Sequence, residues 1–338
     1  MKKPFAALLL AGLAFPAVAQ ETTPAMVAAA EKEGKVVWYS SVDVKVGEAV
    51  ARVFREQYPK IPIEVERAGS ERVFQRVNQE MQSGIKNADV VNSSDASHFL
   101  FWKQQAKLAK HTPPDALKFP AQYRDPDGTY FTWRATLSPM GYNTNLLKEA
   151  EAPKGYKDLL DPKWKGKLVK AHPGYSGTAL TGTYAITRAL GWDYLEKLSK
   201  QGVQQLQSTT APPKTLASGE RAVMVDGNEY NMFIEIQNKS PVKIIYPVEG
   251  TPFVSSPTAI FSDAPHPSAA RVLQNFLFTP KIQQLMVDEG GARSVHPDVK
   301  EPADRTPLSK IKLLPDDPQG MLPLITEIKK KYTALFGN

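Results

Sequence analysis

Residues 35–95 alternate between strand-like and helix-like patterns, and this order constrains the fold more than any other feature of the sequence. Residues 35–40 run β-branched and aromatic side chains together without polar alternation, as a strand buried on both faces does. Apolar side chains then recur at helical spacing until Pro59, and the cycle repeats from strands at 61–67 and 88–91. This order predicts an α/β fold with a parallel sheet and helices on both of its faces.

A second α/β region follows a stretch at 110–124 that is dominated by proline and polar residues. A strand is expected at 130–136, and the second region starts after it, at 139–144. Further strands are expected at 166–171, 203–208, 222–225, 242–246 and 253–261, and helices at 177–190, 268–278, 281–289 and 321–336. The chain has 338 residues, which is enough for two domains of ordinary size. We therefore expect more than one α/β unit.

Composition excludes several classes of function. The sequence has no cysteine, which excludes a disulfide scaffold, a thiolate zinc site, an iron–sulfur cluster and a cysteine nucleophile. Its 42 Lys and Arg against 35 Asp and Glu give a net charge of +7. This modest excess does not indicate a nucleic-acid-binding protein, and it weakly favours an anionic solute through long-range attraction.

The N-terminus has the pattern of a secretory signal peptide. A positive segment with Lys2 and Lys3 precedes an apolar run over 5–15, and Ala17 and Ala19 have the A-x-A spacing of a cleavage site. The run is shorter than the roughly 20 residues of a spanning helix. We expect a signal peptide at 1–19, cleavage after Ala19, and a periplasmic protein without a membrane anchor.

Six short runs along the chain carry a resemblance to a known family. They are 36–40 (VVWYS), 141–146 (GYNTNL), 161–168 (DPKWKGKL), 173–178 (PGYSGT), 244–251 (IIYPVEGT) and 264–270 (APHPSAA). Together they resemble a periplasmic solute-binding protein of an ABC importer. The sub-family concerned contains binders of ferric iron and of phosphorylated organic solutes.

This resemblance implies a two-lobed fold of type II, in which each lobe is a mainly parallel sheet flanked by helices. Two crossover strands join the lobes, with one lobe at 20–135 and 256–320, the other at 137–255, and a C-terminal helix at 321–338. A small solute binds between the lobes, which close on it like a hinged clamp. The resemblance also implies an inner-membrane ABC permease as partner, a monomer, no cofactor and no nucleic acid.

Hydroxyl-bearing turns follow several of the predicted strands, at points where helices begin. The candidate solute contacts of this kind are Ser40, Ser41, Ser70, Ser93, Ser94, Ser176, Gly177 and Thr178. A helix N-terminus offers free N–H groups and a partial positive charge to anionic oxygens. Serine is also a common N-cap that contributes about 1 kcal/mol to its own helix, so each residue has a purely structural alternative.

Three cationic side chains are candidate anchors for an anion: Arg72 in the first turn of a helix, Arg134 on a predicted crossover strand, and His172 before a loop. An arginine pairs with carboxylate or phosphate through two parallel hydrogen bonds. Each arginine could instead lie on a solvated face or pair with a neighbouring acid. The resemblance adds Tyr142, which lies in the matched run at 141–146.

The segment 226–231 (DGNEYN) discriminates between solute classes. It resembles the place where ferric-binding relatives carry two adjacent tyrosines, but here Tyr230 is followed by Asn231. Asn228, Glu229 and Tyr230 are therefore candidate contacts to a small organic anion, phosphorylated or carboxylated. Ferric iron, held by Glu71, Glu229 and Tyr230, is the alternative.

Catalytic motifs are incomplete. Residues 174–178 approach G-x-S-x-G but have Thr178 where the last glycine belongs, and the sequence has neither H-E-x-x-H nor a phosphate-binding loop. We expect a protein that is not an enzyme, with a secreted hydrolase as a remote alternative.

Overall fold

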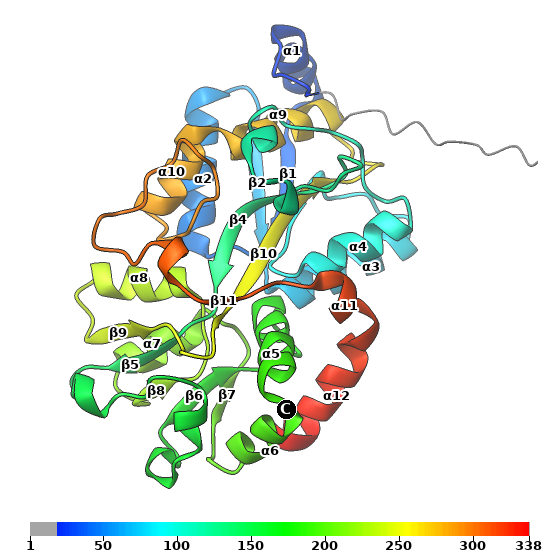
Figure 1. The fold of residues 1–338 in the computed structure, drawn as a ribbon. Coiled ribbons are helices and arrows are strands. Elements are labelled where there is room, and N and C mark those ends of the chain that lie inside the picture. The colour runs from blue at the N-terminus through cyan, green and yellow to red at the C-terminus, as the bar shows by residue number, and fades with distance from the viewer. Residues whose placement is uncertain (1–18, 338) are drawn as a thin grey trace, which may run out of the picture.

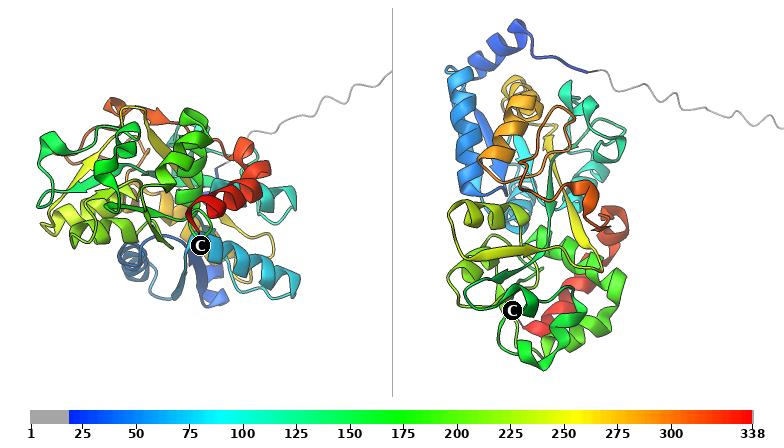
Figure 2. Two further views of the ribbon diagram at one scale, coloured as in Figure 1. Left: turned by 90° about the horizontal axis from the view of Figure 1, so that it is seen from below. Right: turned by 60° about the vertical axis from the view of Figure 1, so that its left-hand side comes forward.

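Two β-sheets, each flanked by helices, lie end to end in the computed structural model, which describes residues 19–337 (Figures 1 and 2). We call the body around the N-terminal sheet the first lobe and the other body the second lobe. The predicted signal peptide lies outside the described residues except for its last position. Within 19–337, no helix combines the length and apolar character needed to cross a membrane.

The sheet of the first lobe has the strand order β11-β10-β3-β1-β2, and β4 pairs with β10. Its strands are β1 Val36–Ser40, β2 Ile63–Arg67, β3 Val90–Asn92, β4 Phe131–Leu137, β10 Thr251–Ile260 and β11 Leu313–Leu314. Strand β1 runs parallel to β2 and β3, whereas β10 runs antiparallel to β3 and β4. The parallel core is the one that the alternating pattern predicts.

The sheet of the second lobe has the order β7-β6-β8-β5-β9. Its strands are β5 Met140–Asn143, β6 Leu168–Ala171, β7 Gln204–Leu206, β8 Val223–Met224 and β9 Val242–Ile245. Strand β6 is parallel to β7 and β8, and β5 is antiparallel to both of its neighbours. Both sheets are thus mixed rather than mainly parallel, because strands next to the crossovers enter in the opposite direction.

Helices cover both faces of each sheet (Figure 1). The first lobe has α1 Pro24–Glu33, α2 Val44–Gln57, α3 Ser70–Gln82, α4 Ala96–Gln104, α9 Pro267–Phe278 and α10 Pro280–Asp288; the second has α5 Gly177–Leu190, α6 Trp192–Ser199, α7 Ala211–Ala217, α8 Glu229–Gln237 and α12 Ile325–Phe336, and α11 Pro318–Met321 lies between. Helix α2 shows the local logic: Asp43 caps it through the N–H of Lys45, and Val46, Val50 and Phe54 are buried.

Each lobe has its own hydrophobic core. In the first lobe Trp38 and Trp133 are fully buried and meet edge to face at 5.7 Å. In the second lobe Tyr156, Trp164 and Leu195 are buried together. Burial of such a side chain contributes about 1.5–3 kcal/mol, so each lobe has a source of stability of its own.

The chain passes between the lobes three times, once more than expected. The first passage joins β4 to β5, the second joins β9 to β10, and the third leads from β11 through α11 to α12 (Figure 1). Strand β10 belongs to the first sheet along its whole length, so the expected boundary between 255 and 256 falls inside a strand. The C-terminal helix α12 packs on α5 and α6 of the second lobe.

Candidate functional site

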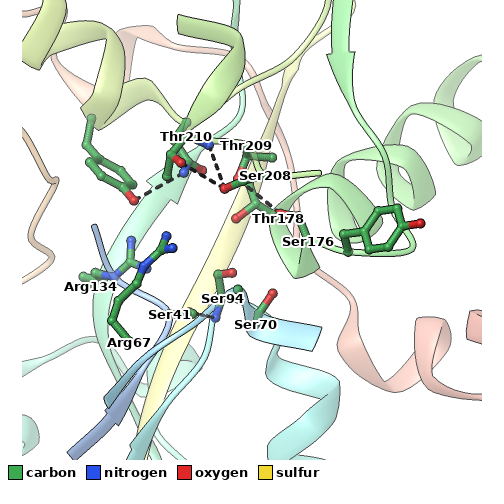
Figure 3. A pocket seen from close by; sticks show the side chains of 14 residues that line it. Ser41, Arg67, Ser70, Ser94, Arg134, Ser176, Thr178, Ser208, Thr209 and Thr210 are labelled. Atoms are coloured by element: carbon green, nitrogen blue, oxygen red, sulfur yellow. Dashed lines mark hydrogen bonds between the residues drawn. The ribbon is translucent and has the colours of Figure 1, made fainter. Parts of the chain in front are cut away.

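A pocket with about 300 Å³ of open space lies where the two lobes meet (Figure 3). Its lining residues are Ser41, Arg67, Gly69, Ser70, Ser94, Arg134, Tyr175, Ser176, Thr178, Ser208, Thr209, Thr210, Asn228 and Tyr230. They come from both lobes, so the pocket exists only while the lobes are together.

Strand ends and helix starts supply most of these side chains. In the first lobe Ser41 follows β1, Arg67 ends β2 and Ser70 begins α3. In the second lobe Ser176 is the N-cap of α5 and Asn228 the N-cap of α8. Carboxyl ends of parallel strands meet at one edge of a sheet, and here the two edges face each other.

The lobes are closed against each other in this structure. The backbone N–H of Gly177 in α5 donates to Ser70 Oγ of the first lobe at 2.7 Å. Lys329 of α12 reaches Glu71 of α3 with Nζ and Oε2 2.7 Å apart. A pair of lobes held by such direct contacts encloses whatever occupies the pocket.

Substitution of Gly177 by alanine is expected to prevent complete closure. A Cβ atom there would lie 2.5 Å from Cβ of Asp95 and 3.0 Å from the carbonyl oxygen of Ser94, across the lobe interface. Solute affinity should fall at least about tenfold, which corresponds to about 1.4 kcal/mol. Calorimetry gives the affinity, and small-angle scattering should show a larger radius of gyration in the presence of solute.

Gly182→Ala is the matched control on the same helix. A Cβ at Gly182 would meet nothing nearer than Ser138 Oγ at 3.6 Å, which is ordinary contact. This variant should close and bind as the parent does. A Gly177→Ala protein that did the same would show that the contact around Asp95 does not limit closure.

Arg134 gives the pocket its charge. Its side chain is 2% exposed, and its Nη1 donates to Thr136 Oγ1 at 2.7 Å. Its Nε has no hydrogen-bond partner, and among residues 19–337 neither Arg134 nor Arg67 forms an ion pair with an acidic side chain. Burial lowers the pKa of the Arg134 guanidinium from its ordinary value, which is the effect of desolvating a cation.

The second arginine extends the positive region toward solvent. Arg67 is exposed and donates from Nε to the carbonyl oxygen of Val42 at 3.1 Å, which leaves its other nitrogens available. Figure 3 shows the ends of the Arg67 and Arg134 side chains next to each other at one side of the pocket. Among residues 19–337, no aspartate or glutamate lines the pocket.

Tyr230 and Asn228 complete this side of the pocket. The guanidinium carbon of Arg134 lies 5.4 Å from the centre of the Tyr230 ring. Burial raises the pKa of Tyr230, so the phenol keeps its proton at neutral pH, and its oxygen accepts a 3.3 Å hydrogen bond from Nδ2 of Asn228. The Oδ1 atom of Asn228 is buried without a partner. The arrangement can hold an anion through two guanidinium groups and can hydrogen-bond neutral polar groups elsewhere.

The structure brings many of the predicted site residues together. Those that line the pocket are Ser41, Ser70, Ser94, Arg134, Ser176, Thr178, Asn228 and Tyr230. Gly177 stands at the lobe interface beside them. All but Arg134 lie where a strand ends or a helix begins.

The remaining predicted residues lie elsewhere. Ser40 and Ser93 point into the first lobe, where they bond Asn92 and His98. Tyr142 packs in the core of the second lobe. His172 bonds the carbonyl oxygen of Gly337, and exposed Arg72 reaches Gln207 with a 3.3 Å hydrogen bond. None of these residues is among those that line the pocket.

Glu229 is also absent from the lining. Its two carboxylate oxygens bind Arg293 at 2.7 and 2.9 Å, and Tyr246 donates to it at 2.6 Å. Glu71 is likewise occupied by Lys329. The carboxylate of Glu229 is paired with Arg293, and that of Glu71 is paired with Lys329. The alternative iron ligands Glu71, Glu229 and Tyr230 therefore do not converge on one site.

Five side chains in the lining were not predicted: Arg67, Tyr175, Ser208, Thr209 and Thr210. Arg67 ends a strand, and the three hydroxyls at 208–210 stand between β7 and α7. The pattern of hydroxyl-bearing turns that selected Ser70 and Ser176 would have found these three hydroxyls but not Arg67. Tyr175 has no such signal, since it lies in a loop that approaches Gly69 only through closure.

Two closing α/β lobes around a polar pocket define a solute-binding clamp. The chain belongs to the bacterial extracellular solute-binding protein family, whose sequence profile matches residues 86–312. It is 21% identical over 262 residues to a Sinorhizobium fredii protein named "Probable ABC transporter periplasmic-binding protein y4fP", which covers 74% of this chain and 72% of that one. A Salmonella typhimurium protein named for 2-aminoethylphosphonate binding is 29% identical over 175 residues, 47% of this chain and 49% of that one.

Solved structures share the fold over nearly the whole chain. The periplasmic binding protein AfuA from Actinobacillus pleuropneumoniae, with fructose 6-phosphate bound, superposes with a TM-score of 0.82 at 21% identity and covers 90% of this chain and 98% of its own. Iron-bound HitA from Pseudomonas aeruginosa gives 0.76 at 18% identity, with 89% and 99% covered. The predicted two-lobed fold of ABC-importer binding proteins is thereby confirmed. Because the two solved proteins have this fold but bind different solutes, the fold does not identify the solute, and the pocket residues must.

Proposed function

We propose that this protein captures a small organic anion with a phosphate or phosphonate group and delivers it to an ABC permease of the inner membrane. The observation that carries the proposal is an interlobe pocket with two arginines and no carboxylate. Among residues 19–337 the buried Arg134 guanidinium forms no direct ion pair, although the charge of Asp43 acts on it, and an anionic solute in contact with it would offset the cost of burying it.

The number of donors favours a phosphoryl group over a carboxylate. Eight serine and threonine residues line the pocket together with the two arginines. Helices α3 and α8 begin there without a side-chain cap, which leaves N–H groups for a ligand. A phosphoryl group has three oxygens for these donors, whereas a carboxylate has two. Each charge-assisted hydrogen bond contributes about 1.5–3 kcal/mol.

The lining also indicates what the rest of the solute is. Hydroxyl groups of the solute can both donate to and accept from the serines and threonines at 176–178 and 208–210. An ammonium group would find no carboxylate in the pocket, and an ammonium buried without a partner costs several kcal/mol. We infer a hydroxylated phosphate or phosphonate rather than an amino-substituted one.

A matched pair of ligands tests this inference. 2-Hydroxyethylphosphonate is expected to bind at least about tenfold more tightly than 2-aminoethylphosphonate, a difference of about 1.4 kcal/mol. Isothermal calorimetry on chelator-treated protein measures both, with glycerol phosphate and fructose 6-phosphate in the same panel. Tighter binding of the amino compound would show that a carboxylate outside the lining takes part in recognition.

Native mass spectrometry of protein purified from its own periplasm is the most direct test of the solute class. A co-purified phosphate or phosphonate ester is the expected result, and stoichiometric binding without conversion would agree with a receptor rather than a hydrolase. A coloured ferric complex, bleached by chelator and abolished by Tyr230→Phe, would contradict the proposal and favour iron.

Export and the partner are part of the same proposal. The leader at 1–19 and cleavage after Ala19 would place the protein in the periplasm as a monomer without a membrane anchor. Intact-mass analysis of the exported protein should give a chain that begins at Gln20.

A further inference from the structure

Behind the pocket, three ionisable side chains of the first lobe converge on one point. Glu71 lies in the first turn of α3, Asp95 is the N-cap of α4, and His98 lies one turn further along α4. Nε2 of His98 is 3.3 Å from Oε1 of Glu71 and 3.5 Å from Oδ2 of Asp95. The three side chains are 4%, 6% and 0% exposed for His98, Glu71 and Asp95.

Two of these atoms lack a hydrogen-bond partner although they are buried. Among the described residues, Oε1 of Glu71 and Oδ2 of Asp95 accept no hydrogen bond of good geometry, and their contacts with Nε2 of His98 are long. Their distances from His98 Nε2 exceed the usual 2.7–3.2 Å of an N–H···O bond. Buried carboxylate oxygens are rarely left in this state, and here both face the same imidazole nitrogen.

We propose that Glu71, Asp95 and His98 form a site for a first-row divalent metal ion, Zn²⁺ foremost. Zinc binds imidazole nitrogen and carboxylate oxygen at about 2.0–2.2 Å in tetrahedral geometry, which separates neighbouring ligand atoms by about 3.3–3.6 Å. The 3.3 and 3.5 Å separations in this cluster are in that range. Three protein ligands leave the fourth position for water.

Neighbouring groups hold the three ligands in place. Nδ1 of His98 is 2.9 Å from Ser93 Oγ, which directs Nε2 toward the carboxylates. The other oxygen of Asp95 accepts from the N–H of Ser97 at 2.9 Å, and Phe74 stacks on the His98 ring. A metal ligand with its second nitrogen fixed in this way needs little rearrangement on binding.

Charge also favours a cation here. Lys329 binds Oε2 of Glu71 and offsets one of the two carboxylates, which leaves one negative charge when the imidazole is neutral. None of the three ligands lines the solute pocket, but Glu71 and Asp95 adjoin Ser70 and Ser94, which do. The metal would thus fix the starts of α3 and α4 beside the pocket and is separate from the transported solute.

The closed lobes cover this site. Lys329 belongs to α12 of the second lobe, and Gly177 of α5 lies against Asp95. Metal entry is therefore expected in the open state.

Cobalt substitution tests the proposal on the complete mature protein. Chelator-treated protein titrated with Co²⁺ alone should develop the strong visible absorption of tetrahedral cobalt, and Zn²⁺ should abolish it at one equivalent. Glu71→Gln and His98→Gln should each weaken Zn²⁺ binding at least about 100-fold, measured by calorimetry and by metal content. No organic anion is added, so the outcome is independent of the proposed solute.

His266→Gln is the matched control. His266 also pairs with a buried carboxylate, Asp89, at 2.9 Å, but no second carboxylate from the described part of the chain pairs with its other nitrogen. This variant should bind Zn²⁺ as the parent does. Absence of a tetrahedral cobalt spectrum in the parent protein, or full Zn²⁺ binding by folded Glu71→Gln, would overturn the proposal and identify the cluster as an ion-pair network.

Discussion

Replacement of Arg134 by methionine is expected to abolish anion capture and to raise the thermal stability of the solute-free protein. Arg134 is 2% exposed, has no acidic partner within 19–337 and keeps an unbonded Nε. Two lost charge-assisted hydrogen bonds correspond to about 3 kcal/mol or more, hence at least about a 100-fold loss of affinity. Removal of a buried unpaired charge should stabilise the fold by about 1 kcal/mol or more.

Calorimetry with the tightest organic phosphate and thermal unfolding without ligand measure the two effects. Arg67→Met is the comparison: Arg67 is exposed, so we expect a loss of affinity near tenfold and little change in stability. An Arg134→Met protein that keeps its affinity would remove this residue from the site. One that is less stable than the parent would show that the guanidinium is compensated inside the protein.

Replacement of Arg293 by methionine is expected to have the opposite effect on stability. Arg293 binds Glu229 through two hydrogen bonds, at 2.7 and 2.9 Å, and both side chains are at most 2% exposed. Burial by itself would lower the pKa of Arg293. The hydrogen bonds and the negative charge of Glu229 outweigh burial and raise this pKa above its ordinary value. Without the arginine, Glu229 would remain as a buried charge, and the free energy of unfolding should fall by about 3–5 kcal/mol.

The double variant Glu229→Leu/Arg293→Met separates the ion pair from the packing around it. It should recover most of the lost stability, because no unpaired charge then remains. Chemical denaturation of the four proteins completes the cycle. Equal instability of the single and double variants would show that packing around Tyr246, rather than the charge, dominates.

Arg293 shows why sequence reasoning stops short of the full arrangement around the site. It stands in an ordinary stretch of sequence, and no local feature predicts that Glu229, 64 residues away, lies against it. Glu229 was predicted to contact the solute because it precedes Tyr230 in the sequence. In the structure its carboxylate instead binds Arg293 and Tyr246. Pairing of charges depends on which elements meet, and that is decided by the packing of the lobes.

The sequence by itself determined the strand–helix alternation of the first lobe, the resemblance to solute-binding proteins and the turns that carry Ser41, Ser70 and Ser176. These features depend on local periodicity and on the few residues that suit a helix start, so neighbouring residues are enough to specify them. Only the tertiary structure decided that Arg134 faces the pocket while Arg72 does not. It also decided that Glu71, Asp95 and His98 meet behind the pocket, because residues that are distant along the chain become neighbours only when helices and lobes pack.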